Sequence, residues 1–238
     1  MIPITSILMS KYNPWPLELI NPRPEPGQIR EMGYEWDDPR DIIDIFEKKV
    51  AEFAGSKYAV AVDCCSHAIF LSLMYVTSGE ILLAAIPTIP RNTYISVPQT
   101  IRHVGFDHVF YEDLKWSGVY QIKPTRVWDA AVRWTEGMYI KGSLMCLSFQ
   151  IKKRIPIGRG GMILCDKKEE YEWLKLASYD GRDLNTPYDS PGHVKMEGWH
   201  YYMTPEDAAR GIILMDQTPR VNEDQGGWEN YPNIMERV

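Results

Sequence analysis

Residues 41–76 read DIIDIFEKKVAEFAGSKYAVAVDCCSHAIFLSLMYV, and this stretch predicts a helix, a strand and a second helix. Apolar residues recur at helical spacing from Ile42 to Phe53, and Gly55 follows as the expected C-terminal cap. The run KYAVAVD is typical of a buried strand, and SHAIFLSLMYV of a helix with Ser66 at its N-cap. A strand that turns tightly into a helix is the repeating unit of α/β folds.

The rest of the chain continues this alternation. Short apolar runs bounded by turn residues predict further strands at EILLAAIP (80–87), DHVFYED (107–113), TRVWDAA (125–131) and GGMILCD (160–166), and residues 92–105 are helix-like. We therefore expect one α/β domain over residues 41–216 with a largely parallel sheet. The proline-rich residues 1–40 predict an extended arm, and residues 217–238 an irregular tail.

Composition narrows the class of protein. The chain has 238 residues, 45% of them apolar, and a formal net charge of −6, which argues against a nucleic-acid-binding face. Its four cysteines lack the spacing of a disulfide framework or a zinc site, so reduced thiols and no metal are expected. No apolar run approaches the roughly 20 residues that span a bilayer. A soluble cytoplasmic protein is the expectation.

Three positions could carry chemistry, and each has a structural alternative. The turn before Ser66 opens a helix, where backbone N–H groups attract an anion, although a serine there can simply cap the helix. Asp129 ends an apolar strand, where ligands of open α/β folds bind, or it is an ordinary turn aspartate. The basic residues 152–154 include a lysine suited to Schiff-base chemistry, or they form a solvated loop.

The order of these motifs along the chain favours the functional interpretation of each position over the structural one. The chain resembles the DegT-type (DegT/StrS) sugar aminotransferases, pyridoxal-phosphate (PLP) enzymes of fold type I. Residues 46–73 resemble the family's opening helix and phosphate turn, and residues 92–105 its Thr-aromatic helix. WDAA (128–131) resembles Asp-Ala-Ala, SFQIKKRIPIGRGG (148–161) resembles Ser-Phe-x₃-Lys with Gly-Glu-Gly-Gly, and residues 198–211 resemble the family's Gly-Tyr-Asn-Tyr-Arg-Met-Thr helix start. The resemblance covers roughly residues 41–216.

The resemblance implies the large domain of the PLP-dependent transferase fold, reduced in size, and a role for each matching residue. Lys153 would be the Schiff-base lysine, and Asp129 would face the pyridine nitrogen. Tyr94 would stack on the cofactor ring. The phosphate would be held by Ser66, Ser148, the amides around Cys65 and His67, and His200 of a partner subunit.

Departures from the family pattern are also visible. Val132 stands where relatives have Gln or His, Arg159 replaces the Glu of Gly-Glu-Gly-Gly, and His200 replaces an Asn. A strand-helix unit before the Asp motif and the C-terminal small domain are expected to be missing.

The implied function is transfer of an amino group from an amino acid, with glutamate as the expected donor, to a keto-sugar nucleotide in a homodimer with shared active sites. A pyridoxamine-dependent dehydratase is one alternative, but His is expected there at the position of Lys153. A non-catalytic binding or regulatory module of the same fold is the other.

Overall fold

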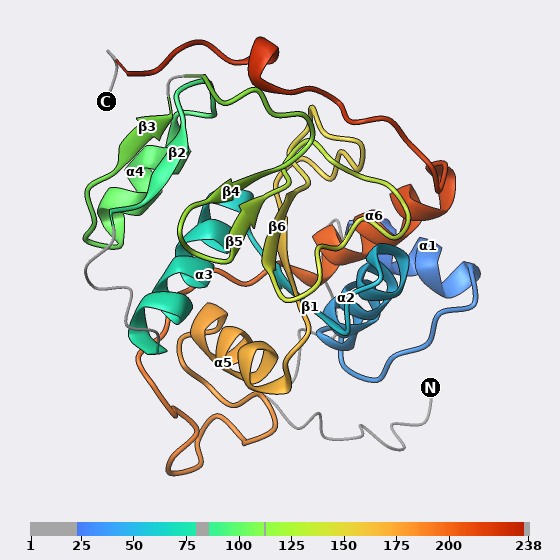
Figure 1. The fold of residues 1–238 in the computed structure, drawn as a ribbon. Coiled ribbons are helices and arrows are strands. Elements are labelled where there is room, and N and C mark those ends of the chain that lie inside the picture. The colour runs from blue at the N-terminus through green and yellow to red at the C-terminus, as the bar shows by residue number, and fades with distance from the viewer. Residues whose placement is uncertain (1–22, 80–85, 112, 236–238) are drawn as a thin grey trace, which may run out of the picture.

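The structure, a computed structural model, describes residues 23–79, 86–111 and 113–235. The helices are α1 (Glu25–Glu31), α2 (Asp41–Ala54), α3 (Cys65–Gly79), α4 (Ser96–His103), α5 (Lys168–Ser178) and α6 (Pro205–Gln217), with a short 3₁₀ helix η1 (Trp228–Asn230). The strands are β1 (Tyr58–Val62), β2 (Thr88–Pro90), β3 (Val109–Tyr111), β4 (Tyr120–Ile122), β5 (Val127–Asp129), β6 (Leu144–Ser148) and β7 (Gly161–Cys165). The expected alternation of helices and strands is present (Figure 1).

The main sheet has five strands in the order β1-β7-β6-β5-β4, and β2 and β3 form a separate parallel pair. The expected largely parallel sheet was wrong for the main sheet, because only β5 and β6 pair in parallel there. The physical reason is the length of the connections, since a parallel pair needs a crossover of about a dozen residues, usually a helix. Residues 123–126 join β4 to β5 directly, so these strands form an antiparallel hairpin.

The region before the Asp motif also differs from the expectation of a wholly missing strand-helix unit. The strand is present as β4, and no helix is assigned among the described residues between β3 and β5. Without a helix to carry the chain across the sheet, β4 enters from the loop after β3 and runs opposite to β5. This places Tyr120 of β4 directly across from Asp129 of β5 in the ladder.

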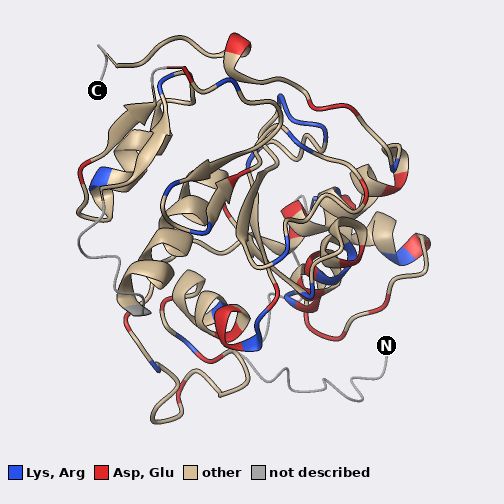
Figure 2. Cartoon of the chain, in the orientation of Figure 1, with Lys and Arg blue, Asp and Glu red and all other residues tan. Residues whose placement is uncertain are grey.

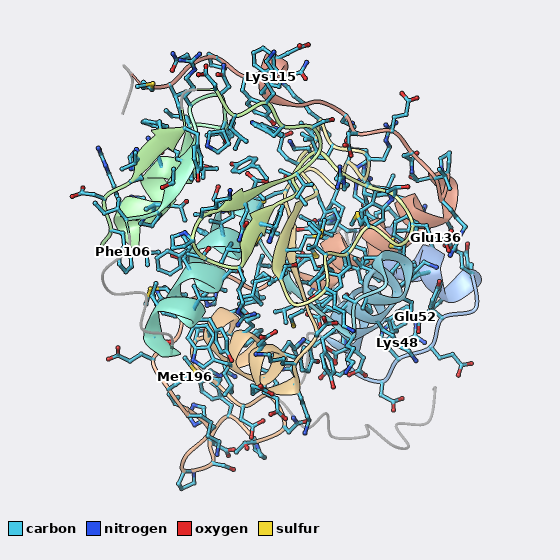
Figure 3. All side chains as sticks on the ribbon, in the orientation of Figure 1. Lys48, Glu52, Phe106, Lys115, Glu136 and Met196 are labelled. Atoms are coloured by element: carbon cyan, nitrogen blue, oxygen red, sulfur yellow. The ribbon has the colours of Figure 1, made fainter. Side chains whose placement is uncertain are left out.

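Helices cover both faces of the sheet (Figure 1). One apolar cluster joins α2 and α6 to the sheet side chains that include Met145 and Leu147, and the other joins α3 and α5 to those that include Leu144 and Cys146. Successive side chains of β6 therefore point into opposite layers, as the alternation of a strand requires. Figure 3 shows side chains filling both layers. Both signs of charge are mixed along α2 and α5 (Figure 2).

The N-terminal region corrects one expectation and confirms another. Residues 1–22 of the predicted arm, and most of the predicted strand at 80–87, lie outside the described residues. Residues 25–31 form α1 rather than an extended arm, since proline is tolerated in the first turn of a helix, and Ile29 is fully buried. The helix over residues 41–54 is confirmed, and Gly55 caps it with a left-handed φ of 83°.

The start of α3 also corrects a prediction. The helix begins at Cys65, so Ser66 lies within the first turn and is not the N-cap. The Ser66 hydroxyl instead lies 2.7 Å from the Ser96 hydroxyl at the start of α4. None of the helices that the structure describes combines the length and apolar character needed to cross a membrane.

Residues 218–235, which we name the strap, cross the sheet edge after α6. In Figure 1 the red strap runs from α6 toward β2 and β3, and in Figure 3 the labelled Glu136 and Lys115 lie along its course. Glu136 N–H donates to Arg220 C=O, Gly118 N–H donates to Gly226 C=O, and Ile234 N–H donates to Arg91 C=O. The predicted irregular tail is thus largely irregular in conformation but fixed in position.

Candidate active site

A pocket of about 530 Å³ opens between the β5 and β6 ends, the start of α3 and the strap. Small-molecule sites commonly measure roughly 300–1,000 Å³. Of the side chains predicted for the site, those that line this pocket are Cys65, Ser66, Tyr94, Asp129, Ser148 and Lys153. Residues separated by up to 88 positions in the sequence are therefore gathered at one cavity.

Asp129 is the buried acid of the pocket. Its residue is 6% exposed, and its two carboxylate oxygens accept from the Tyr120 hydroxyl at 2.8 Å and the Ala131 N–H at 2.9 Å. Burial raises the pKa of the Asp129 carboxyl, although both donors and the charge of Lys153 oppose that rise. Within the described residues, no Lys or Arg forms an ion pair with it. The carboxylate can therefore accept a cationic group from a ligand.

The basic turn after β6 brings two lysines to the pocket wall. Lys152 is exposed and Lys153 is half-buried, and both line the cavity. The charge of Lys153 lowers the pKa of both Asp129 and Cys65, although burial dominates and raises both values. Lys153 is therefore the lysine that interacts with the buried acid.

The glycine-rich end of this turn packs against the start of α3. A side chain at Gly161 would overlap the peptide between Cys64 and Cys65, so only glycine allows this close approach. Gly158 adopts a φ of 123°, which other residues rarely adopt. The basic, glycine-rich turn and the turn before α3, which the sequence analysis singled out separately, thus form one wall of the pocket.

The start of α3 offers donors to an anion. Its first N–H groups have no partner within the helix, and the hydroxyls of Ser66, Ser96 and Ser148 all line the same pocket. Ser96 is the first residue of the helix α4 and was missed from the sequence, since a serine at a helix start carries no signal that distinguishes a binding role from capping. The arrangement suits a phosphate group.

A network of charges flanks this anion end. Asp63 accepts from Arg159 at 2.8 Å and pairs with the His67 ring at 2.5 Å. Burial alone would lower the pKa of His67, but the hydrogen bonds and charges of Asp63 and Cys64 together outweigh it and raise the value to about 9. The donor atoms of Asp63, Cys64 and His67 lie within 4.8 Å of one another, and the carboxylate is already held by cations.

Two predicted residues lie outside the pocket. The His67 ring stacks on Tyr201 with 3.6 Å between centroids, and the residue does not line the cavity. His200 has a side chain 71% exposed and pairs with Asp180 at 2.9 Å, away from the pocket of its own chain. Tyr94 lines the pocket and is 59% exposed.

The strap supplies a further wall, which sequence reasoning missed. Gln225, Gly226, Asn230 and Tyr231 line the cavity, and Trp116 faces them from the loop before β4. Burial, with Asp129 nearby, raises the pKa of Tyr231 to about 12. Asn92 fixes this segment by donating to the Tyr231 C=O at 2.9 Å. These contacts join distant segments, so no local pattern indicates them.

Comparison with known proteins finds similarity to the same family that the sequence motifs resemble. Residues 36–139 match the model of the DegT/DnrJ/EryC1/StrS aminotransferase family. The spore coat polysaccharide biosynthesis protein SpsC of Bacillus subtilis is 24% identical over 255 residues, covering 84% of this chain and 63% of SpsC. The resemblance predicted from the motifs is confirmed, and the chain spans less than two thirds of this relative's length.

Solved structures establish the fold. AtS13 from Actinomadura melliaura superposes with a TM-score of 0.64 at 16% identity, covering 81% of this chain and 63% of AtS13. The PLP form of the sugar aminotransferase Spr1654 from Streptococcus pneumoniae gives 0.60 at 14% identity, covering 75% and 59%. The fold type I class predicted from the sequence is confirmed, with the mixed sheet described above.

The residues present fit PLP by their chemistry. A primary amine, a buried carboxylate with neutral donors and an anion-binding helix start meet in one cavity. These groups match the aldehyde, the ring nitrogen and the phosphate of the cofactor, respectively. We therefore assign the pocket as the candidate cofactor site.

Proposed function

We propose that the chain is a PLP-dependent sugar aminotransferase, because it matches the DegT/DnrJ/EryC1/StrS aminotransferase family model and has the fold of solved sugar aminotransferases. It would move an amino group from an amino acid, with glutamate as the expected donor, to a keto-sugar carried on a nucleotide. One observation supports this most: among the described residues the buried Asp129 carboxylate has only neutral hydrogen-bond donors, and it shares its cavity with Lys153. The family resemblance supports the donor and the sugar.

Each residue then has a defined task. The Lys153 amine holds the cofactor covalently and moves the proton that amino transfer requires. The Asp129 carboxylate keeps the ring nitrogen protonated, while Ser66, Ser96 and Ser148 hold the phosphate with the first amides of α3. When bound, PLP supplies an electron sink for the bond changes at the amino acid.

The test begins with the lysine. After PLP is added and the protein is reduced with borohydride, peptide mapping should place the pyridoxyl label on Lys153. Lys152→Ala should keep the label and Lys153→Ala should lose it, so the neighbouring lysine is a matched control. Label on Lys152, or no label at all, would overturn the assignment of the turn.

A PLP-binding protein without turnover is the second candidate. Hydrogen bonds hold the strap against the pocket, where it forms part of the wall, and a wall fixed in this way favours a binding role. Adding glutamate to the PLP-loaded protein separates the two candidates. Conversion of the absorption band to that of pyridoxamine phosphate supports transfer, whereas a band that never converts supports binding alone.

We also propose a cytoplasmic homodimer with shared sites, in which His200 of one subunit approaches the cofactor phosphate of the other. His200 is exposed and outside the pocket of its own chain, which is compatible with a role across an interface. Mixing Lys153→Ala subunits with His200→Ala subunits should restore one intact site per hybrid dimer. A monomer in sedimentation, or a hybrid without recovery, would contradict the shared site.

A further inference from the structure

Tyr120 is the residue across the ladder from Asp129. In the antiparallel β4–β5 pair the two residues are direct partners, so their side chains lie on the same face of the sheet. Tyr120 is 4% exposed, and its hydroxyl donates to Asp129 Oδ2 at 2.8 Å. The unusual direction of β4 therefore places a phenol against the acid of the candidate site.

A second hydroxyl completes this chain of hydrogen bonds. Thr93 Oγ1 lies 2.5 Å from the Tyr120 hydroxyl, and Thr93 is 1% exposed. Since the single Tyr120 proton is used toward Asp129, Thr93 is the donor to Tyr120. Thr93 follows β2 and lines the same pocket, so the chain runs from the pocket wall through Tyr120 to the acid.

Val132, three residues after Asp129, offers the carboxylate no side-chain donor. Val132 is apolar and 8% exposed, whereas relatives are expected to carry a Gln or His there. In the part of the chain that the structure describes, Asp129 therefore has one donor for each oxygen: the Ala131 N–H for Oδ1 and Tyr120 for Oδ2. Without Tyr120, Oδ2 would have no donor among the described side chains, and the carboxylate could rotate.

We propose that Tyr120 is the positioning residue of this site, fixing the Asp129 carboxylate in the orientation that a protonated ring nitrogen requires. This rests on the proposed cofactor site. Tyr120 gives this support from the neighbouring strand β4. It acts through Asp129 and need not touch the cofactor.

The experiment measures affinity rather than activity. Binding of pyridoxamine 5′-phosphate, which has the ring nitrogen and needs no covalent bond to Lys153, is compared with binding of its 1-deaza analogue, which lacks that nitrogen. Tyr120→Phe should weaken the first about tenfold, since a hydrogen bond to a charged group is lost. Affinity for the deaza analogue should stay unchanged, because that ring offers Asp129 no proton.

Three further variants sharpen the result. In an Asp129→Asn background, Tyr120→Phe should cause no additional loss, since Tyr120 acts only through the carboxylate. Thr93→Val should cause a smaller loss than Tyr120→Phe, and it keeps the test available should the phenylalanine variant fail to fold. Tyr139→Phe is the matched control, because that hydroxyl donates to the Ser143 C=O at 2.9 Å, away from the pocket.

The outcomes separate the inference from the proposed function. Equal losses for both probes would assign Tyr120 to packing alone and overturn the inference, as would an unchanged affinity for pyridoxamine phosphate. A wild-type protein that binds neither probe would overturn the proposed function itself. A loss confined to the probe with the ring nitrogen, and absent when Asp129 is replaced, supports the inference.

Discussion

Two buried carboxylates of this chain differ in what surrounds them. Glu47 on α2 is 3% exposed, and Lys175 Nζ lies 2.9 and 3.1 Å from its two oxygens. The Ala61 N–H also donates to Glu47 at 2.7 Å. Asp129 is buried to a similar degree but has a phenol and one backbone N–H as its donors.

The two carboxylates differ in where their positive partner comes from. A buried carboxylate is costly unless it is paired and hydrogen-bonded, and Glu47 obtains its pairing within the chain. Asp129 lies in a pocket wall where a ligand can supply that positive charge. Burial raises the pKa of both groups, so a shifted pKa alone does not separate them. The source of the cation distinguishes the structural acid Glu47 from Asp129, the acid that we propose to act on the cofactor.

The largest expected effect tests this distinction directly. Asp129→Asn should slow amino transfer on the order of 10³-fold, because a neutral amide cannot hold the ring proton in a buried site. Glu47→Gln should leave turnover within about twofold and lower stability instead. Turnover with glutamate and urea unfolding are measured for both variants. Equal losses of turnover would remove the distinction between the two acids.

The second prediction breaks the structural pair. Lys175→Met should reduce the free energy of unfolding by ~3 kcal/mol, because Glu47 is then left without its cation. Burial raises the pKa of Glu47 to about 7 although Lys175 lowers it, so the variant carboxyl should take up its proton at a higher pH than the wild-type one. The loss should therefore shrink as pH falls toward about 7, since protonation removes the unpaired charge.

Urea unfolding at several pH values measures this effect. Lys153→Met is the matched lysine control and should change stability little, because Lys153 is only half-buried and has no ion pair among the described residues. A Lys175→Met protein as stable as wild type at pH 8 would mean that Glu47 is neutral in the native state.

The parts of the fold and of the candidate site that the sequence predicts are those marked by a pattern of neighbouring residues. The helix over 41–54 follows from its periodicity, and the strand over 58–62 from its apolar run. Ordered motifs indicated Asp129, Ser148 and Lys153, which the structure places in one pocket. A motif and its place in the chain order carry this information without knowledge of long-range contacts.

What the sequence could not predict depends on pairing across the chain. The reversed direction of β4 follows from a short connection, and Tyr120 faces Asp129 only through that register. The Arg159–Asp63 pair joins residues 96 positions apart, although the departure at Arg159 was visible. Some of the bonds that hold the strap are backbone bonds, which any residue but proline can donate. Its side-chain bonds, such as that of Asp224 to Arg133, reach distant residues, so the strap sequence gives no local sign of its position.

The third prediction concerns the strap, which closes the pocket of Asp129 and not the surroundings of Glu47. Arg133 holds Asp224 through two hydrogen bonds of 2.9 and 2.8 Å. Arg133→Ala should increase the dissociation rate of pyridoxamine phosphate about fivefold, because the loosened strap exposes the pocket.

Stopped-flow fluorescence measures this rate. Arg220→Ala provides the control, since it removes an exposed ion pair of the same segment with Glu136, farther from the pocket. That variant should dissociate at the wild-type rate. A similar acceleration in both variants would point to general loosening of the strap rather than to closure at the pocket.

The smallest effect concerns Asp63, an acid intermediate between the two, half-buried and paired with His67. The pKa of His67 is raised to about 9, because the contributions of Asp63 and Cys64 together outweigh the lowering by burial. A raised folded-state pKa gives stability that is present below about pH 6.5 and lost as pH rises through about 9. With partial solvent screening this should amount to ~1 kcal/mol.

His67→Gln should flatten the decline in stability between these pH values in urea unfolding. His193→Gln is the control, because the His193 ring contacts the backbone C=O of Ser190, and it should retain the decline. A decline that persists in His67→Gln would show that another group produces it.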